Sequence, residues 1–232
     1  MISGATGALA VIMVSLVLLG NERGEAGPSR AFAGFDGSPL PSALAAMSAP
    51  HPRKRLATVW LAGCSGCHMS FLDLDEWLID LADQAEIVYS PVGSDQKGYP
   101  EAVDIALVEG GVANTDNLAL LRQVREHTHT LVSFGDCAIT ANIPGMRNML
   151  QGADPVLRRS YLDLADGSAQ LPHAPGVIPE LMDRVLPVHE LVPVEVFLPG
   201  CPPSAERIRM VLQALLRDQT PRALNADQIR FG

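Results

Sequence analysis

The spacing of hydrophobic residues predicts a regular alternation of strands and helices from about residue 56 onward. Continuous apolar runs alternate there with stretches in which apolar residues recur at helical spacing. A continuous apolar run is typical of a parallel strand, because such a strand is covered on both faces. The expected strands cover residues 56–62, 87–89, 104–108, 130–134 and 194–198, and the expected helices cover residues 69–85, 114–127 and 204–217. Strands that alternate with helices predict an α/β fold, a doubly wound parallel sheet with helices on both faces.

The first 55 residues do not follow this alternation. Residues 5–19 form an apolar run that is shorter than the ~20 residues needed to cross a bilayer, and no basic residue precedes it as in a signal peptide. Residues 24–52 are rich in Gly, Pro, Ala and Ser, which predicts a disordered linker. The apolar run has three interpretations: a helix that docks on a partner, a weak membrane-associated segment, or a start-site overrun. We prefer the last, in which the natural protein begins at or near Met47. We expect no stable membrane insertion and a separate domain over residues 56–232.

Composition excludes some partners and favours a compartment. The chain has 232 residues, of which 47% are hydrophobic, so it can build a sizeable core. Its 26 acidic and 17 basic side chains give a formal net charge of −9, which repels phosphate backbones, and we expect no nucleic-acid partner. Only four cysteines occur, whereas small secreted proteins use dense disulfide frameworks. The sparse count favours a reducing compartment, the cytoplasm, and a metal or redox role for the cysteines.

The four cysteines follow the ends of expected strands. Cys64 and Cys67 come directly after the first strand, Cys137 follows the strand that ends at residue 134, and Cys201 follows the strand that ends at residue 198. In doubly wound sheets, ligands bind beyond the carboxyl ends of the strands. The sequence therefore predicts that all four thiols meet at one edge of the sheet.

Three kinds of site remain open from the spacing alone. A [4Fe–4S] cluster takes four thiolates, commonly one close pair and more distant residues, and this arrangement is favoured. Glycines beside the ligands would let the backbone approach the sulfides. These are Gly63, Gly66, Gly135 and Gly200. A structural zinc site is the first alternative, although such sites usually bring two close pairs. A thioredoxin-like redox pair at Cys64 and Cys67 is the second, and it leaves the other two cysteines unexplained.

Four local strings go further than spacing. In chain order they are LAGCSGCHMSFLDLDE, DIALVEGGV, SFGDCA and LPGCPPS. Together they resemble the small subunits of [NiFe] hydrogenases over about residues 56–220. The resemblance implies a flavodoxin-like fold and a [4Fe–4S] cluster bound by Cys64, Cys67, Cys137 and Cys201. It also implies a separate large subunit that carries the nickel–iron centre.

The number of cysteines indicates which subgroup of the family this chain resembles. No cysteine follows Cys201 in this sequence, so only one cluster with four cysteine ligands can form. The chain is therefore similar to the small subunit of soluble, bidirectional NAD-reducing hydrogenases. That similarity implies electron relay between the nickel–iron site and diaphorase subunits, and FMN could bind near the cluster, with no ligands assigned. The homologous iron–sulfur subunit of complex I-like quinone oxidoreductases typically has two adjacent cysteines instead. That subunit and a zinc-stabilised binding module are the alternative functions.

Several polar residues near the cysteines have two interpretations each. Glu109 ends a buried strand and either orients loops or relays protons near the cluster, or simply accepts bonds from loop N–H groups. His68 either donates to a cluster sulfur or is an ordinary loop histidine. An acidic group after the first cysteines is expected to be solvated or to face a subunit; it comprises Asp73, Asp75 and Glu76. Residues 153–193 have little periodicity and predict a long loop that covers the large subunit.

Overall fold

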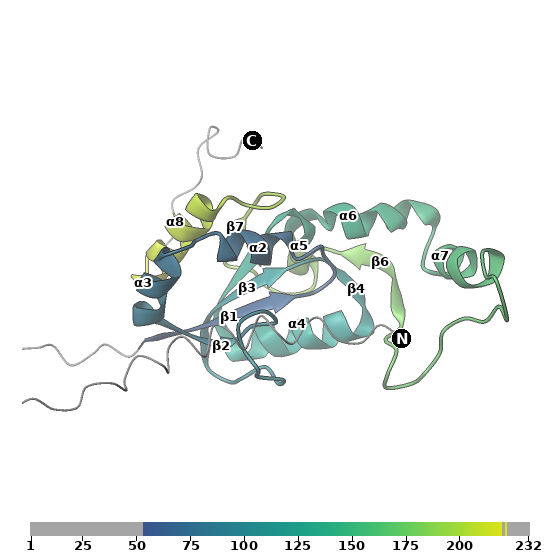
Figure 1. Cartoon of the computed structure of the whole chain (residues 1–232), viewed down its shortest axis with the longest axis horizontal. Coiled ribbons are helices and arrows are strands. Elements are labelled where there is room, and N and C mark those ends of the chain that lie inside the picture. The colour runs from purple at the N-terminus through teal and green to yellow at the C-terminus, as the bar shows by residue number, and fades with distance from the viewer. Residues whose placement is uncertain (1–52, 220, 222–232) are drawn as a thin grey trace, which may run out of the picture. The chain divides into compact units, whose positions relative to one another are not determined.

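The computed structural model describes residues 53–219 and 221. Its centre is a sheet of five parallel strands in the order β2-β1-β3-β5-β7 (Figure 1). The strands are β1 (Lys54–Trp60), β2 (Ala85–Tyr89), β3 (Val103–Glu109), β5 (Thr128–Phe134) and β7 (Val196–Leu198). Counted along the sheet, this is the 2-1-3-4-5 order of flavodoxin-like folds. The predicted α/β fold with a doubly wound parallel sheet is therefore confirmed.

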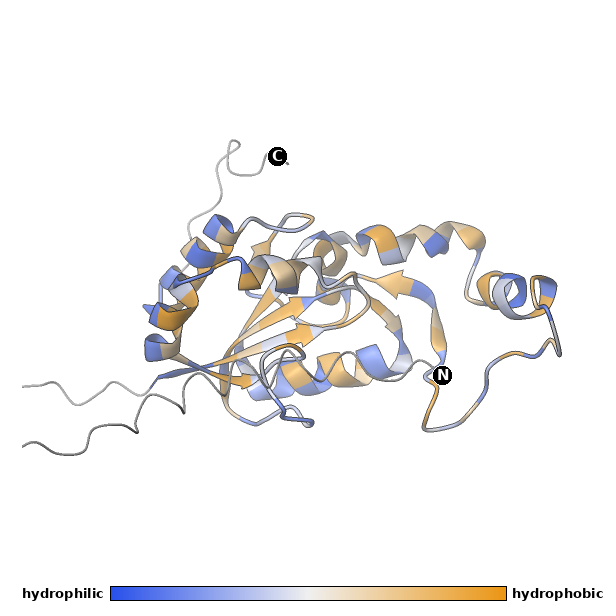
Figure 2. Ribbon diagram, in the orientation of Figure 1, coloured by the Kyte–Doolittle hydropathy of each residue, from blue (hydrophilic) through white to orange (hydrophobic). Residues whose placement is uncertain are grey.

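Helices cover both faces of this sheet (Figure 1). Three of them, α2 (Gly66–Leu72), α3 (Trp77–Gln84) and α8 (Ala205–Leu216), lie on one face, and α4 (Thr115–His127) lies on the other. The strands alternate between two cores: Leu107 and Phe134 pack under the three helices, whereas Val108 and Leu131 pack against α4. Figure 2 shows the resulting hydrophobic colouring along the central strands. This two-sided burial is the reason for the continuous apolar runs.

The two residues that were predicted to cap helices do so in the structure. The Asn114 side chain accepts a hydrogen bond from the backbone N–H of Asn117 at 2.8 Å, and α4 begins at the next residue. The Ser204 hydroxyl accepts from the backbone N–H of Arg207 at 3.4 Å at the start of α8. Each cap satisfies an N–H group that has no partner inside its helix.

The single helix expected over residues 69–85 was wrong. The structure has two helices, α2 and α3, separated by turns over residues 73–76, and Asp75 has a positive φ of 49°. A continuous helix would place Asp73 and Glu76 three positions apart on one face, where like charges repel. The break instead leaves the carboxylates exposed while Leu74 and Trp77 are both buried.

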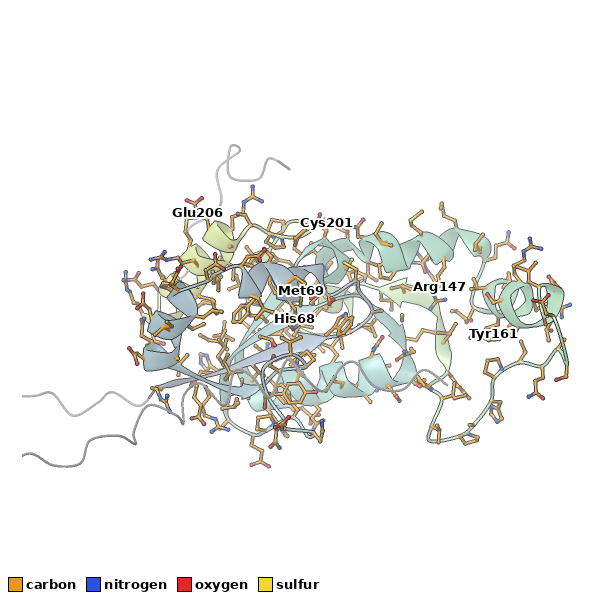
Figure 3. The ribbon with its side chains drawn as sticks, viewed as in Figure 1. His68, Met69, Arg147, Tyr161, Cys201 and Glu206 are labelled. Atoms are coloured by element: carbon orange, nitrogen blue, oxygen red, sulfur yellow. The ribbon has the colours of Figure 1, made fainter. Side chains whose placement is uncertain are left out.

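The prediction of one long loop over residues 153–193 was wrong at both ends of that stretch. The stretch contains α7 (Asp154–Arg158), the π-helical turn η3 (Arg159–Asp163), β6 (Leu181–Leu186) and the turn η4 (Val188–Glu190). Strand β6 pairs antiparallel with β4 (Val112–Asn114), which the sequence did not predict. Arg147, labelled in Figure 3, contacts both strands: its Nη2 donates to the carbonyls of Ala113 at 2.9 Å and Met182 at 2.6 Å. Residues 164–180 have no helix or strand, as expected.

Three short unpredicted elements follow β5: α5 (Asp136–Thr140), α6 (Asn142–Gly145) and the 3-10 turn η2 (Met146–Leu150). They carry the chain from the central sheet towards α7 and β6 (Figure 1). No helix in the part of the chain that the structure describes is long and apolar enough to cross a membrane. The expectations for residues 1–55 and for a start near Met47 lie outside the described residues, except that Lys54 and Arg55 open β1.

Candidate functional site

The four cysteines lie where the parallel strands end. Cys64 is in the loop after β1, Cys67 is in the first turn of α2, Cys137 is in α5 after β5, and Cys201 follows β7. All four thiols are free, Cys67 and Cys137 being buried while Cys64 and Cys201 are exposed. His68 and Cys201, labelled in Figure 3, mark helix α2 and the loop after β7. The sheet therefore brings together the four residues that the sequence singled out.

The charges on these thiols would influence one another. Burial raises the pKa of the Cys67 thiol, and Glu109 and the other three cysteines raise it further. Burial also raises the pKa of Cys137, with Cys201, Cys64 and Glu109 adding to the effect. Both thiols are therefore protonated at neutral pH when no metal is present, and binding a metal group would release protons.

Two loops are tied together around Cys137 and Cys201 by backbone bonds. The backbone N–H of Gly135 donates to the carbonyl of Leu198 at 2.8 Å, and the backbone N–H of Asp136 donates to the carbonyl of Gly200 at 2.9 Å. In return, the Asp136 carboxylate accepts from the backbone N–H of Gly200 at 2.8 Å. Sequence reasoning missed Asp136, because its partner lies 64 positions away in the chain.

Gly135 fits the close approach that was expected of glycines near the ligands. Its φ is 82°, and a Cβ built on it would lie only 2.2 Å from Cys67 Sγ. Gly66 similarly lies beside Cys64, where its backbone N–H donates to Cys64 Sγ at 3.4 Å. Backbone at these positions therefore reaches the thiols where a side chain would prevent it.

Glu109 and His68 form a buried pair beneath the Cys64–Cys67 loop. Glu109 is 1% exposed and His68 is fully buried. The carboxylate accepts from the backbone N–H of His68 at 3.0 Å and makes a short contact with its ring Nδ1. This supports the interpretation of Glu109 as a carboxylate that anchors a loop through N–H groups. Among the described residues, the buried Nε2 of His68 has no hydrogen-bond partner, and no bond from it to a cysteine sulfur is present.

The four thiols are compatible in number with either a [4Fe–4S] cluster or a tetrahedral zinc ion. Within residues 53–219 and 221, no three His, Cys, Asp or Glu side chains gather closely enough to hold one ion. A tetrahedral zinc site needs four donors around one point, whereas the corners of an iron–sulfur cube hold thiolates further apart. A thioredoxin-like pair at Cys64 and Cys67 would leave Cys137 and Cys201, which follow other strands of the same sheet, without a role.

The acidic residues after the first cysteines lie away from this group. Asp73, Asp75 and Glu76 are exposed on the turn between α2 and α3. Their position agrees with a solvated or subunit-facing surface, and they give no ligand to the thiol edge.

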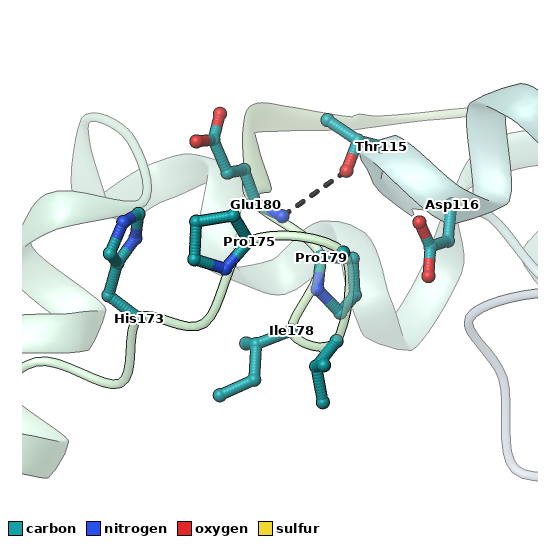
Figure 4. Close-up of a pocket in the computed structure, with 9 residues that line it drawn as sticks. Thr115, Asp116, His173, Pro175, Ile178, Pro179 and Glu180 are labelled. Atoms are coloured by element: carbon teal, nitrogen blue, oxygen red, sulfur yellow. Dashed lines mark hydrogen bonds between the residues drawn. The ribbon is translucent and has the colours of Figure 1, made fainter.

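A separate pocket lies at the start of α4 (Figure 4). It is lined by Thr115, Asp116, His173, Pro175, Gly176, Val177, Ile178, Pro179 and Glu180, and none of the four cysteines takes part. The backbone N–H of Glu180 donates to the Thr115 hydroxyl at 3.2 Å, and the backbone N–H of Thr115 donates to the Glu180 carbonyl at 3.0 Å. These bonds attach the end of the irregular segment 164–180 to the helix.

Comparison with known proteins points to one family. The family model described as "NADH ubiquinone oxidoreductase, 20 Kd subunit" matches residues 64–215, which include all four cysteines. A subunit of the F420-non-reducing hydrogenase of Methanothermobacter marburgensis is 37% identical over 172 residues, covering 71% of this chain and 54% of its own length. The delta subunit of the NAD-reducing hydrogenase HoxS of Cupriavidus necator is 37% identical over 183 residues, covering 77% of this chain and 85% of its own length.

The solved structures extend the match to the fold. A chain of an NAD+-reducing [NiFe]-hydrogenase in the H2-reduced state superposes with a TM-score of 0.71 at 40% identity, covering 78% of this chain and 99% of that one. The chain spans little more than half of the M. marburgensis relative but nearly the whole of this structure. It belongs to the family of the NADH ubiquinone oxidoreductase 20 Kd subunit, and its relatives in that family are hydrogenase small subunits.

Proposed function

We propose that this chain is the electron-transfer small subunit of a [NiFe] hydrogenase and holds one [4Fe–4S] cluster through Cys64, Cys67, Cys137 and Cys201. The observation that carries the proposal is the meeting of these four thiols at the carboxyl edge of the sheet, although up to 70 positions separate neighbours in the sequence. The hydrogenase relatives support the same choice.

When bound, the cluster would supply one-electron transfer. The chain's own part is to fix its position and to set its potential through thiolate ligation, N–H bonds and burial. Cys67 and Cys137 lie on the buried side of the site, and Cys64 and Cys201 lie on the open side. Electrons would therefore enter or leave through protein that covers the exposed pair. The chain itself would not split hydrogen.

We place the large subunit, with its nickel–iron centre, over a face made by α6 and η2. Four apolar side chains are exposed on this docking face: Ile143, Met146, Met149 and Leu150. The face begins directly after Asn142, whose side chain contacts Cys201 Sγ at 3.5 Å. A cluster at the thiols would thus lie next to the covered surface. Segment 153–193 continues from this face and exposes Tyr161, Leu164 and Val177, and we propose that it also contacts the large subunit.

The NAD-reducing relatives support a further proposal about the acceptor. In it, the chain relays electrons between the large subunit and diaphorase subunits that reduce NAD+ in the cytoplasm. FMN could bind at the same sheet edge, as in other flavodoxin-like folds. Reduction of NAD+ by hydrogen in the assembled complex, and flavin analysis of the separated chain, would test these two finer proposals.

The first experiment is the iron and acid-labile sulfide content of the anaerobically purified chain. We expect about four iron and about four sulfide per chain. The Cys201→Ala variant should lose the cluster or hold a damaged one, and unaltered iron content in this variant would contradict the ligand assignment. Zinc without sulfide in the wild type would overturn the electron-transfer proposal in favour of a zinc-stabilised module. A partner without nickel would favour the quinone oxidoreductase function instead.

A further inference from the structure

The start of α6, directly after α5, presents two N–H donors to two different cysteines. Asn142 Nδ2 donates to Cys201 Sγ at 3.5 Å. The backbone N–H of the next residue, Ile143, donates to Cys137. Two successive residues therefore reach thiols that are 64 positions apart in the sequence. Neither residue is a ligand, and neither is needed for the loop bonds that Asp136 makes.

The backbone at the start of α6 is held in place from several sides. Ala141 is buried and has a positive φ of 61°, and its carbonyl accepts from the backbone N–H of Gly145 at 2.7 Å. The Thr140 hydroxyl donates to the carbonyl of Asp136 at 2.9 Å and accepts from the backbone N–H of Asn142 at 3.4 Å. The Asn142 amide is thus carried by a fixed turn, and its direction towards Cys201 does not depend on a flexible loop.

The position of the bond on Cys201 matters electrostatically. Cys201 is one of the two exposed thiols, whereas Cys67 is buried. Hydrogen bonds from the protein therefore matter more for the Cys201 sulfur, because less of its environment is set by burial. A hydrogen bond to a thiolate sulfur stabilises the state with more negative charge. In an iron–sulfur cluster this is the reduced state, so an N–H donor on a ligand sulfur raises the reduction potential.

Resting on the function proposed above, we propose that Asn142 is a tuning residue that raises the reduction potential of the cluster through its bond to Cys201. The residue is half-buried at the start of the docking face, so a partner that covers this face would also shield the bond from water. Shielding strengthens the bond, because a lower local dielectric increases its electrostatic part. Binding of the partner and the reduction potential of the cluster are therefore linked through the Asn142 side chain.

The test compares the wild-type full chain with Asn142→Leu and Asn142→Asp. Asn142→Leu removes the donor, and Asn142→Asp keeps the shape but replaces the N–H group by an oxygen. Gln84→Leu is the matched control, because it removes an exposed amide at the end of α3, beside the amino end of β2 and at the opposite sheet edge from the thiols. Iron and sulfide content is measured first, and the midpoint potential is then taken from an EPR-monitored redox titration.

We expect full iron content and a more negative potential in both Asn142 variants, with the larger shift in Asn142→Asp. The reduction equilibrium should fall by up to about tenfold in Asn142→Leu, or about 59 mV for one electron. An unchanged potential in a fully loaded Asn142→Leu chain would overturn the inference. Loss of iron from both variants but not from Gln84→Leu would also overturn it, since Asn142 would then hold the cluster rather than tune it. If the wild-type chain contains no iron and sulfide, the first measurement already refutes the proposed function itself, and the tuning role of Asn142 is not what has failed.

Discussion

Gly135 shows how one residue limits the geometry of the whole thiol edge. Its φ of 82° lies in the left-handed region, and a Cβ there would overlap Cys67 Sγ. Any side chain would therefore displace either the backbone after β5 or the thiol itself. Gly98 offers the opposite case, because it lies in an exposed loop and a Cβ on it meets no atom within 4 Å.

These two glycines give a matched pair of variants. Gly135→Ala should destabilise the fold by at least about 1 kcal/mol and lose most of the iron, because it combines backbone strain with a collision at a ligand. Gly98→Ala should change neither quantity measurably. Denaturant unfolding and iron analysis of both variants check this expectation, and equal iron content in the two would contradict it.

The buried pair of Glu109 and His68 also limits the geometry of the thiol edge, because it anchors the residues after Cys67 to the end of a strand. Two donors from His68 converge on one buried carboxylate at the end of β3. Buried charges of this kind persist only where they are paired and bonded. The pair therefore fixes the start of α2, and with it the position of Cys67, against the neighbouring strand.

Among the elements, the short edge strand β7 pairs with β5, and one side chain just before it adds further bonds to the same neighbour. Glu195 lies just before the strand, and its carboxylate accepts from the backbone N–H of Leu131 at 2.7 Å and from Arg125 at 2.8 Å. Burial raises the pKa of Glu195, but the Leu131 N–H and the Arg125 guanidinium outweigh it, so the pKa lies below its ordinary value. Because β7 leads directly to Cys201, this carboxylate supports the ligand loop indirectly.

The lowered pKa predicts a loss of stability in acid. A carboxyl group with a depressed folded-state pKa stabilises the fold fully above its unfolded-state pKa, and this contribution disappears as pH falls through the folded-state value. The difference in urea midpoint between wild type and Glu195→Gln should thus be largest at neutral pH and shrink towards about pH 3. A difference that stays constant over this range would show that the charge of Glu195 does not stabilise β7.

The elements also show which parts of the fold a sequence can predict. Strands such as β3 and helices such as α4 have local signals, an apolar run or a cap, and they were predicted to within one or two residues. Strands β4 and β6 were missed because they are short and pair with each other across a large distance in the sequence, and Arg147, which bonds to both, lies more than 30 positions from its partners. The cysteines were predicted together because each follows a strand, whereas Asn142 and Asp136 are polar loop residues whose partners appear only when the loops meet.

On the scale of the whole molecule, the proposed docking face is made of exposed apolar side chains, and none of the four cysteines belongs to it. Met146 is 57% exposed on η2, and Ile79 is 70% exposed on α3. Both are large apolar residues in the solvent, but only Met146 belongs to the face beside Cys201. Exposed apolar side chains that gather in one place are typical of surfaces that a partner covers.

Charge placed on this face should weaken the complex. We expect Met146→Lys to reduce association with the large subunit by about tenfold, since a buried apolar contact is replaced by an unpaired charge. Ile79→Lys should have little effect, and both variants should keep their iron. Co-purification of the large subunit with each variant measures the result, and equal recovery would place the interface elsewhere.

The contrast between the two buried and the two exposed thiols has a consequence for how the protein is made. Cys67 and Cys137 are set in the folded core, while Cys64 and Cys201 open to the surroundings. On the proposed function, the polypeptide can fold first and then receive its iron and sulfide from a delivery protein that docks on the open side. On the same proposal the large subunit would cover that side, so metal delivery would have to come after folding and before closure by the partner.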